Sequence, residues 1–217
     1  MYKTVVFDLD GTLLNTLTDL ADAGNRLCRK YGWPTHERQA YRYFVGNGIP
    51  KLVERLAPAD QRTPAVLEAA LADFKRDYGQ HLRDTTAPYP GIPEMLAKLK
   101  ANGVQLAVFS NKADALAKEV VKDYFGTQYF TIVRGQMTGV APKPAAEGTN
   151  ALLQALHADP ANTLYVGDSN VDVETAHNAN LPCCGAVWGF RTREELNAAG
   201  AEYLAENSDE LYDVIMK

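Results

Sequence analysis

The stretch Thr4-Val5-Val6-Phe7-Asp8-Leu9-Asp10-Gly11-Thr12 decides the fold of this chain. Its first four residues are β-branched or aromatic, and the run stops at Asp8, with a glycine following at position 11. A short continuous apolar run that ends at a turn signal is typical of a strand buried on both faces of a sheet. The stretch therefore predicts a buried parallel strand whose carboxyl end carries two aspartates.

Three similar apolar runs recur further along the chain, at Val104–Phe109, Thr163–Val166 and Cys183–Val187. The segments between them are long enough to form helices. Alternation of strand and helix predicts a parallel sheet covered on both faces. We therefore expect an α/β fold with a three-layer, Rossmann-like core.

Residues 15–86 show a different pattern, because they have helical periodicity and no convincing strand. Apolar or small residues step by three or four from Leu17 to Tyr31, which marks one face of a helix. The pattern returns between Leu67 and Leu82, after Thr63 and Pro64, which suit an N-cap and a first helical turn. The sequence thus predicts a small all-helical domain at 15–86, inserted into a core formed by 1–14 and 87–217.

Composition and charge exclude several classes of partner. The chain has 217 residues and a net charge of −5, without the clustered Lys and Arg of a nucleic-acid-binding surface. The apolar run before Asp8 is too short for a signal peptide or a membrane span. We expect a cytoplasmic protein that binds neither nucleic acid nor membranes, and no feature of the sequence indicates an oligomeric state.

Polar side chains gather after the predicted strands. In open α/β sheets, ligands bind beyond the carboxyl ends of the strands. Lys143 precedes the helix that leads to the third strand. The residues that follow the strands are Asp8, Asp10, Gly11 and Thr12 after the first, Ser110, Asn111 and Lys112 after the second, and Gly167, Asp168, Ser169 and Asp172 after the third.

These residue types at one sheet edge suit phosphoryl transfer. A carboxylate with an ordinary pKa of roughly 4 is ionised at neutral pH, so Asp8 can attack phosphorus directly. Crowded carboxylates and a phosphate repel one another unless a cation lies between them. Mg²⁺ prefers oxygen ligands, which fits Asp8, Asp168 and the main-chain carbonyl of Asp10, with Asp172 holding its waters or orienting Lys143.

The remaining groups have uses in the same reaction. The side chain of Asp10 can face the leaving oxygen, protonate it, and later deprotonate the water that cleaves the aspartyl phosphate. Ser110, Lys143 and the amides near Asn111, at a predicted helix start, can bind the other phosphate oxygens. The sequence therefore predicts Asp8, Asp10, Ser110 and Lys143 as the catalytic residues.

The chain resembles the haloacid dehalogenase superfamily over its whole length. The motifs that carry the resemblance are Asp8-Leu9-Asp10-Gly11-Thr12, Ser110-Asn111, Lys143 and Gly167-Asp168-Ser169-x-x-Asp172. The helical insertion after the first motif resembles the small cap domain of that superfamily, which closes over the sheet edge and selects the substrate. The resemblance implies a Mg²⁺-dependent hydrolase that acts on a small phosphorylated metabolite.

Within the superfamily the chain is most similar to phosphoglycolate phosphatases. The further signals are Val45-Gly46-Asn47-Gly48, Tyr89-Pro90-Gly91-Ile92 and Trp188-Gly189-Phe190-Arg191. The resemblance implies that Gly46, Asn47 and Gly48 form a cap loop that binds a substrate carboxylate, and that Thr12 and Asn111 also contact the substrate. A turn between cap helices is the structural alternative for the glycine loop.

The expected function is hydrolysis of 2-phosphoglycolate to glycolate and phosphate through an aspartyl-phosphate intermediate. Three alternatives stay open at this point: a phosphatase for another small phosphate ester or pyrophosphate, a phosphomutase of the β-phosphoglucomutase kind, and a non-catalytic module that binds a phosphorylated ligand. The presence of all the charged side chains expected for catalysis and metal binding favours an enzyme over a non-catalytic module; these are Asp8, Asp10, Lys143 and Asp168.

Overall fold

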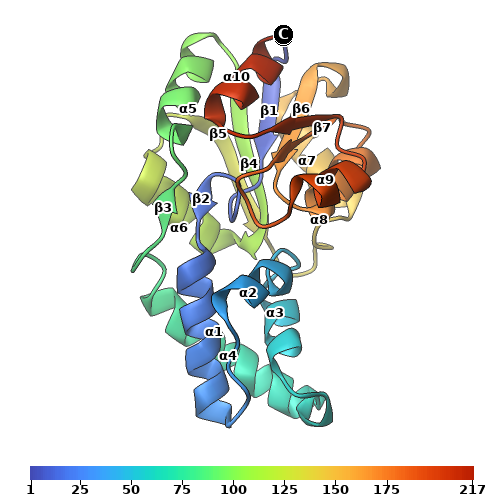
Figure 1. The fold of residues 1–217 in the computed structure, drawn as a ribbon. Helices are drawn as coiled ribbons and strands as arrows, with labels where there is room; N and C mark the ends of the chain where they lie inside the picture. The colour runs from blue at the N-terminus through green and yellow to red at the C-terminus, as the bar shows by residue number, and fades with distance from the viewer. The chain divides into compact units, whose positions relative to one another are not determined.

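The computed structural model describes residues 1–217, and the chain forms two compact units (Figure 1). The first unit consists of Met1–Asn15 and Pro88–Lys217, and the second consists of Thr16–Ala87. Two short strands, β2 (Leu14–Asn15) and β3 (Ala87–Pro88), pair where the chain leaves the first unit and returns to it. The second unit is therefore an insertion within the first.

The first unit is built on a six-stranded sheet with the order β5-β4-β1-β6-β7-β8. Every neighbouring pair runs parallel, which confirms the predicted α/β fold. The predicted first strand lies at the centre, where Val6 is in register with Ala107 on one side and Tyr165 on the other. The strands are β1 (Thr4–Phe7), β4 (Gln105–Ala113), β5 (Phe130–Gln136), β6 (Thr163–Gly167), β7 (Cys183–Ala186) and β8 (Tyr203–Ala205).

Helices cover both faces of this sheet (Figure 1). Val6 and Tyr165 share a buried cluster with residues of α7, α8 and α9. Val5 points to the opposite face and is also fully buried, because successive side chains of a strand alternate. No helix of the chain combines the length and apolar character that crossing a bilayer requires. The helical elements of this unit are α5 (Ile92–Ala101), α6 (Asp114–Phe125), α7 (Ala146–Leu156), η2 (Pro160–Asn162), α8 (Asn170–Asn178), α9 (Arg193–Ala198) and α10 (Ser208–Met216).

Three features of the sheet differ from the sequence prediction. The strands β5 and β8 were not predicted, and both lie at the edges of the sheet, where the strands are only partly buried and the apolar pattern is weak. The strand β4 continues to Ala113 instead of ending at Phe109, with an irregular register between these two residues. Ser110, Asn111 and Lys112 therefore lie in an irregular strand end, two to four residues before α6 begins.

The second unit contains no strand of the six-stranded sheet, and all its elements before Ala87 of β3 are helical, as the periodicity predicts. Thr63 caps α4 by accepting a hydrogen bond from the main-chain N–H of Val66. Its apolar face buries Phe74 and Tyr78, and α1 buries Leu27. The elements are α1 (Leu17–Tyr31), α2 (Arg38–Phe44), α3 (Ile49–Leu56), η1 (Ala59–Gln61) and α4 (Pro64–Gln80).

A buried carboxylate joins the two ends of the second unit. Asp19 in α1 is only 2% exposed and accepts four hydrogen bonds from Thr85 and Thr86. Each of its oxygens receives one main-chain N–H, at 2.9 Å, and one threonine hydroxyl. Because four donors replace the lost hydration, the charge of Asp19 is stabilised inside the unit.

Candidate active site

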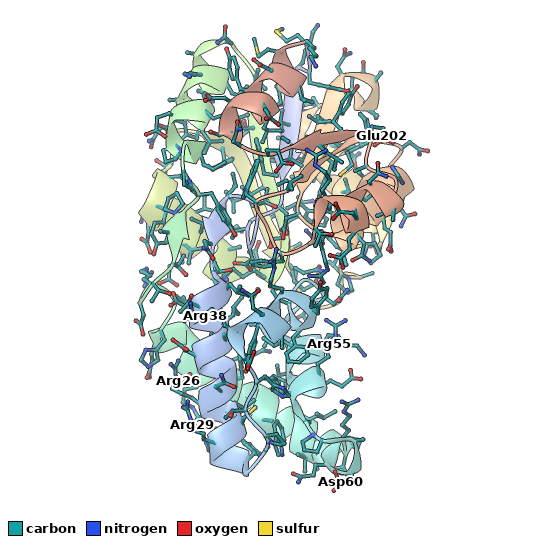
Figure 2. All side chains as sticks on the ribbon, viewed as in Figure 1. Arg26, Arg29, Arg38, Arg55, Asp60 and Glu202 are labelled. Carbon is teal, nitrogen blue, oxygen red and sulfur yellow. The ribbon has the colours of Figure 1, made fainter.

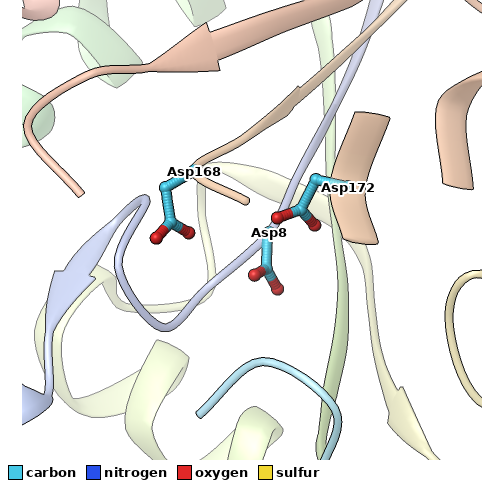
Figure 3. Close-up of side chains that lie close together, drawn as sticks. All are labelled: Asp8, Asp168 and Asp172. Atoms are coloured by element: carbon cyan, nitrogen blue, oxygen red, sulfur yellow. The ribbon is translucent and has the colours of Figure 1, made fainter. Parts of the chain in front are cut away.

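Three carboxylates converge at the carboxyl edge of the sheet. Asp8 follows β1, Asp168 follows β6, and Asp172 lies in the first turn of α8. One oxygen of each lies within 4.8 Å of the others, and Figure 3 shows the three side chains directed into one small region. All three residues are buried, so their mutual repulsion is weakly screened by solvent.

Lys143 supplies a positive charge to this cluster. Its ammonium lies 2.7 Å from Asp172 Oδ1 and 2.9 Å from Asp8 Oδ1, and its side chain is 2% exposed. The hydroxyl of Tyr165, a residue that the sequence did not single out, lies 3.3 Å from the same nitrogen. Asp172 is fixed in turn, because its Oδ2 accepts hydrogen bonds from the N–H and the hydroxyl of Ser169 in a capping box.

Burial changes the acidity of these groups. It raises the pKa of Asp8 to about 6, above the ordinary value of roughly 4, against the opposing effect of Lys143. Burial, with the charges of Asp172 and Asp8, raises the pKa of Asp168 well above its usual range. Burial lowers the pKa of Lys143, but the carboxylates of Asp172 and Asp8 outweigh that effect and hold it well above its usual range. A bound cation favours ionised carboxylates and therefore acts against the two increases.

A second lysine pairs with the fourth aspartate. The Lys112 ammonium lies 3.1 Å from Asp10 Oδ1 and 3.3 Å from Oδ2, and the Asp10 carboxylate is separate from the three-carboxylate cluster. Taken as ionised, the four aspartates and two lysines leave a formal charge of −2, which one divalent cation balances. Apart from the Lys143 ion pair, Asp8 Oδ1 has no hydrogen-bond donor. These residues therefore fit a divalent cation.

Two glycines allow the chain to pack tightly around Asp168. A Cβ on Gly11 would lie 2.3 Å from Asp168 Oδ2, and one on Gly189 would lie 2.2 Å from Asp168 Cβ. The main-chain N–H of Phe190 donates to Asp168 Oδ2 at 2.8 Å. We expected Thr12 to contact the substrate; instead it is fully buried and its hydroxyl donates to Asp168 Oδ1 at 3.0 Å. The Trp188–Arg191 segment, noticed in the sequence only as a resemblance, thus holds a carboxylate of the cluster.

The end of β4 lies beside the same cluster. Asn111 contacts the main chain of Lys143 twice, because its Oδ1 accepts from the Lys143 N–H at 2.8 Å and its Nδ2 donates to the Lys143 carbonyl at 3.2 Å. This side chain, which we expected to contact the substrate, therefore positions Lys143. The Ser110 hydroxyl is buried and accepts a hydrogen bond from the Lys112 N–H at 3.3 Å.

The predicted loop Gly46-Asn47-Gly48 lies in the second unit, between α2 and α3. Both glycines have positive φ, +111° and +83°, which other residues rarely adopt. Arg55 of α3, labelled in Figure 2, donates to the Phe44 carbonyl and to Asn47 Oδ1, both at 2.8 Å. Because Arg55 occupies the side-chain oxygen of Asn47, the loop has a fixed conformation.

A profile of the haloacid dehalogenase-like hydrolase family matches residues 5–186, and the chain belongs to this family. It is a phosphatase of this family. Similar proteins carry the name of a more specific phosphatase. The chain is 31% identical to a phosphoglycolate phosphatase of Chromobacterium violaceum, over 98% of this chain and 96% of the relative. It is also 31% identical to a phosphoglycolate phosphatase of Thiobacillus denitrificans, over 87% of this chain and 84% of the relative. A crystal structure from Lactobacillus delbrueckii subsp. bulgaricus, provisionally assigned as a phosphoglycolate phosphatase, aligns with a TM-score of 0.93 at 28% identity, covering 99% of this chain and 98% of that one.

Proposed function

We propose that this phosphatase hydrolyses a small phosphomonoester, with 2-phosphoglycolate as the leading substrate, in a Mg²⁺-dependent reaction. The observation that carries the proposal is the meeting of Asp8, Asp168 and Asp172 with Lys143 at one edge of a parallel sheet. A carboxylate nucleophile, a fixed cation and a place for a divalent ion are the groups that phosphoryl transfer needs.

Asp8 is the proposed nucleophile. With a pKa of about 6 it is mostly ionised at neutral pH, and a bound cation increases the ionised fraction. Lys143 lies beside the attacking carboxylate and can bind a phosphate oxygen there, while Ser110 can donate its hydroxyl to another. Asp10 is the proposed acid for the leaving oxygen and the base for the water that releases phosphate.

Asp8, Asp168 and the main-chain carbonyl of Asp10 would hold the metal ion. When bound, Mg²⁺ supplies positive charge to the phosphate oxygens and reduces repulsion between the phosphate and the carboxylates. Thr12, Phe190 and Gly189 keep Asp168 in the orientation that this role requires. The two raised carboxylate pKa values support the assignment, because such groups need a cation to be ionised together.

The choice of 2-phosphoglycolate rests on the names of the relatives and on the second unit. We propose that residues 15–86 act as the substrate-selecting cap and that Gly46, Asn47 and Gly48 bind the substrate carboxylate. The Arg55 hydrogen bond to Asn47 Oδ1 supports this role, because it directs an acceptor away and leaves the amide Nδ2 as the donor end of that side chain. Amide donors suit a carboxylate ligand.

A substrate panel tests the proposal directly. The purified protein is incubated with Mg²⁺ and with 2-phosphoglycolate, sugar phosphates, a sugar bisphosphate and pyrophosphate, and released phosphate is measured. We expect the highest kcat/KM for 2-phosphoglycolate, no release after chelation of the metal, and no turnover by Asp8→Asn. Release of no phosphate from any of these compounds would refute hydrolysis, and preference for another ester would refute the substrate assignment.

A further inference from the structure

Lys112 forms a buried contact with both oxygens of Asp10. Its side chain is 2% exposed, and its ammonium lies 3.1 Å from Oδ1 and 3.3 Å from Oδ2. The Asp10 side chain is 14% exposed, so this carboxylate is more accessible to solvent than the ammonium that it contacts. The sequence placed Lys112 after the second strand but gave it no role.

The contact with Lys112 restricts the orientation of the Asp10 carboxylate. The terminal rotation of an aspartate carboxylate is broad and roughly two-fold, so one hydrogen bond constrains it weakly. A donor near both oxygens defines the plane of the carboxylate. The main chain of Lys112 is itself held, because its N–H donates to Ser110 Oγ. The position of the ammonium therefore depends on the sheet and not on a mobile loop.

Burying this ammonium also has a cost that a purely structural role explains poorly. Removing a charge from water costs several kcal/mol unless it is well paired, and an apolar pair of similar volume is often as stable. The carboxylate partner of this ammonium, Asp10, is not one of the three aspartates that form the metal-binding cluster. Lys112 is therefore in a position to orient the Asp10 carboxylate.

We propose that Lys112 is a positioning residue that holds the Asp10 carboxyl group in the direction needed for proton transfer to and from the substrate. The inference rests on the proposed function, in which Asp10 is the acid and base. Both Asp10 oxygens accept from the Lys112 ammonium in the structure; during the reaction one would keep that hydrogen bond while the other would face the reacting oxygen.

The two half-reactions define what Asp10 does and what Lys112 does not do. In the first, a bond forms between Asp8 and phosphorus, the bond to the leaving oxygen breaks, and the Asp10 proton passes to that oxygen. In the second, water oxygen bonds to phosphorus, the Asp8–phosphorus bond breaks, and a water proton passes to Asp10. Lys112 keeps its protons throughout and determines only the orientation of Asp10.

This role predicts a dependence on the leaving group. Alkyl alcohols are poor leaving groups and need the proton, whereas nitrophenolate leaves without it. For Lys112→Met we expect kcat/KM to fall about 10- to 100-fold with 2-phosphoglycolate, as for a catalytic group that is misplaced by up to 1 Å. With p-nitrophenyl phosphate we expect a fall of less than about threefold, since kcat/KM reports only the first transfer there.

A matched control and a second variant separate positioning from stability. Lys118→Met removes a lysine that pairs with Asp114 on the exposed face of α6 and should match the wild type with both substrates. Lys112→Arg restores a cation that can donate to both Asp10 oxygens and should recover most of the lost activity with 2-phosphoglycolate. Thermal unfolding is measured for each variant. If Lys112→Met does not fold, Lys112→Gln is read by the same leaving-group criterion.

A double-mutant cycle gives the decisive comparison. If Lys112 acts through Asp10, adding Lys112→Met to Asp10→Asn causes no further loss with 2-phosphoglycolate. A further loss, or an equal loss with both leaving groups, overturns the inference. Wild-type protein that hydrolyses no phosphate ester refutes the proposed function itself. A damaged Asp10→Asn beside a normal Lys112→Met refutes only the role of Lys112.

Discussion

Replacing Gly189 by alanine tests whether close packing sets the metal site. The added Cβ would lie 2.2 Å from Asp168 Cβ and 2.6 Å from the Gly11 carbonyl oxygen. Neither neighbour is the free end of a flexible side chain, so one of the two chain segments must move. Gly189 has no left-handed φ, so the clash and not backbone strain is what the substitution measures.

The size of the effect follows from these distances. Ordinary contact begins at 3.4 Å, so Asp168 must shift by roughly 1 Å. Overpacking of this kind costs about 1–3 kcal/mol. Where metal binding requires Asp168 in the strained position, that cost enters the binding constant as about a 5- to 150-fold change. We therefore expect Gly189→Ala to raise the Mg²⁺ concentration for half-maximal phosphate release by about 5- to 150-fold.

The assay is a Mg²⁺ titration of phosphate release at saturating substrate, with calorimetric binding of the metal alone as a second readout. Gly79→Ala is the matched control, because a Cβ there meets nothing within 4 Å. This control should leave the Mg²⁺ requirement unchanged and raise the free energy of unfolding by about 0.5–1 kcal/mol, since Gly79 lies in α4. An unchanged Mg²⁺ requirement in Gly189→Ala would show that this packing does not set the geometry of Asp168.

Three further outcomes are expected. Because the pKa of Asp8 is raised to about 6, divalent-cation affinity should increase from pH 5 to pH 7, with proton release detected by calorimetry at pH 6; a pH-independent affinity would contradict this. Asp19→Ala should lower the free energy of unfolding by about 2–4 kcal/mol, measured in urea, while the exposed Asp22→Ala should change it by less than about 0.5 kcal/mol. Equal effects of the two variants would show that the buried hydrogen bonds of Asp19 do not stabilise the unit. Arg55→Ala should raise the KM for 2-phosphoglycolate about tenfold and leave the KM for p-nitrophenyl phosphate unchanged, and the exposed Lys51→Ala is the control. Equal increases of KM for both substrates would refute carboxylate recognition by the Gly46–Gly48 loop.

The sequence predicted the centre of the sheet better than its edges. β1 is buried on both faces, so its apolar run is continuous and visible without an alignment. β5 is only partly buried along most of its length, and β8 has three residues, so neither has a pattern that distinguishes it from a loop. The helical insertion was predictable because α1 and α4 each bury one face.

For the site, the sequence predicted which residues meet and was less successful with what each one contacts. Motif order indicated that Asp8, Asp168 and Lys143 share a sheet edge, but not that burial raises the pKa of Asp8. Thr12 and Asn111 were assigned to the substrate because polar residues near a site can serve either the ligand or the site itself. Their partners, Asp168 and the main chain of Lys143, became evident only from the fold.

The central position of β1 in the sheet also affects the order in which strands can pair while the chain is synthesised. Its two neighbours in the sheet pair Thr4 with Gln105 and with Thr163, so the strand that leads to Asp8 is synthesised long before either partner. Residues 16–87 are complete by then and have a compact set of local contacts. During synthesis the apolar first strand therefore has no partner on either edge until β4 is made, and an unpaired apolar strand is prone to aggregation. Asp168 and Asp172 come later still, so products that end before them lack part of the site and should have no activity.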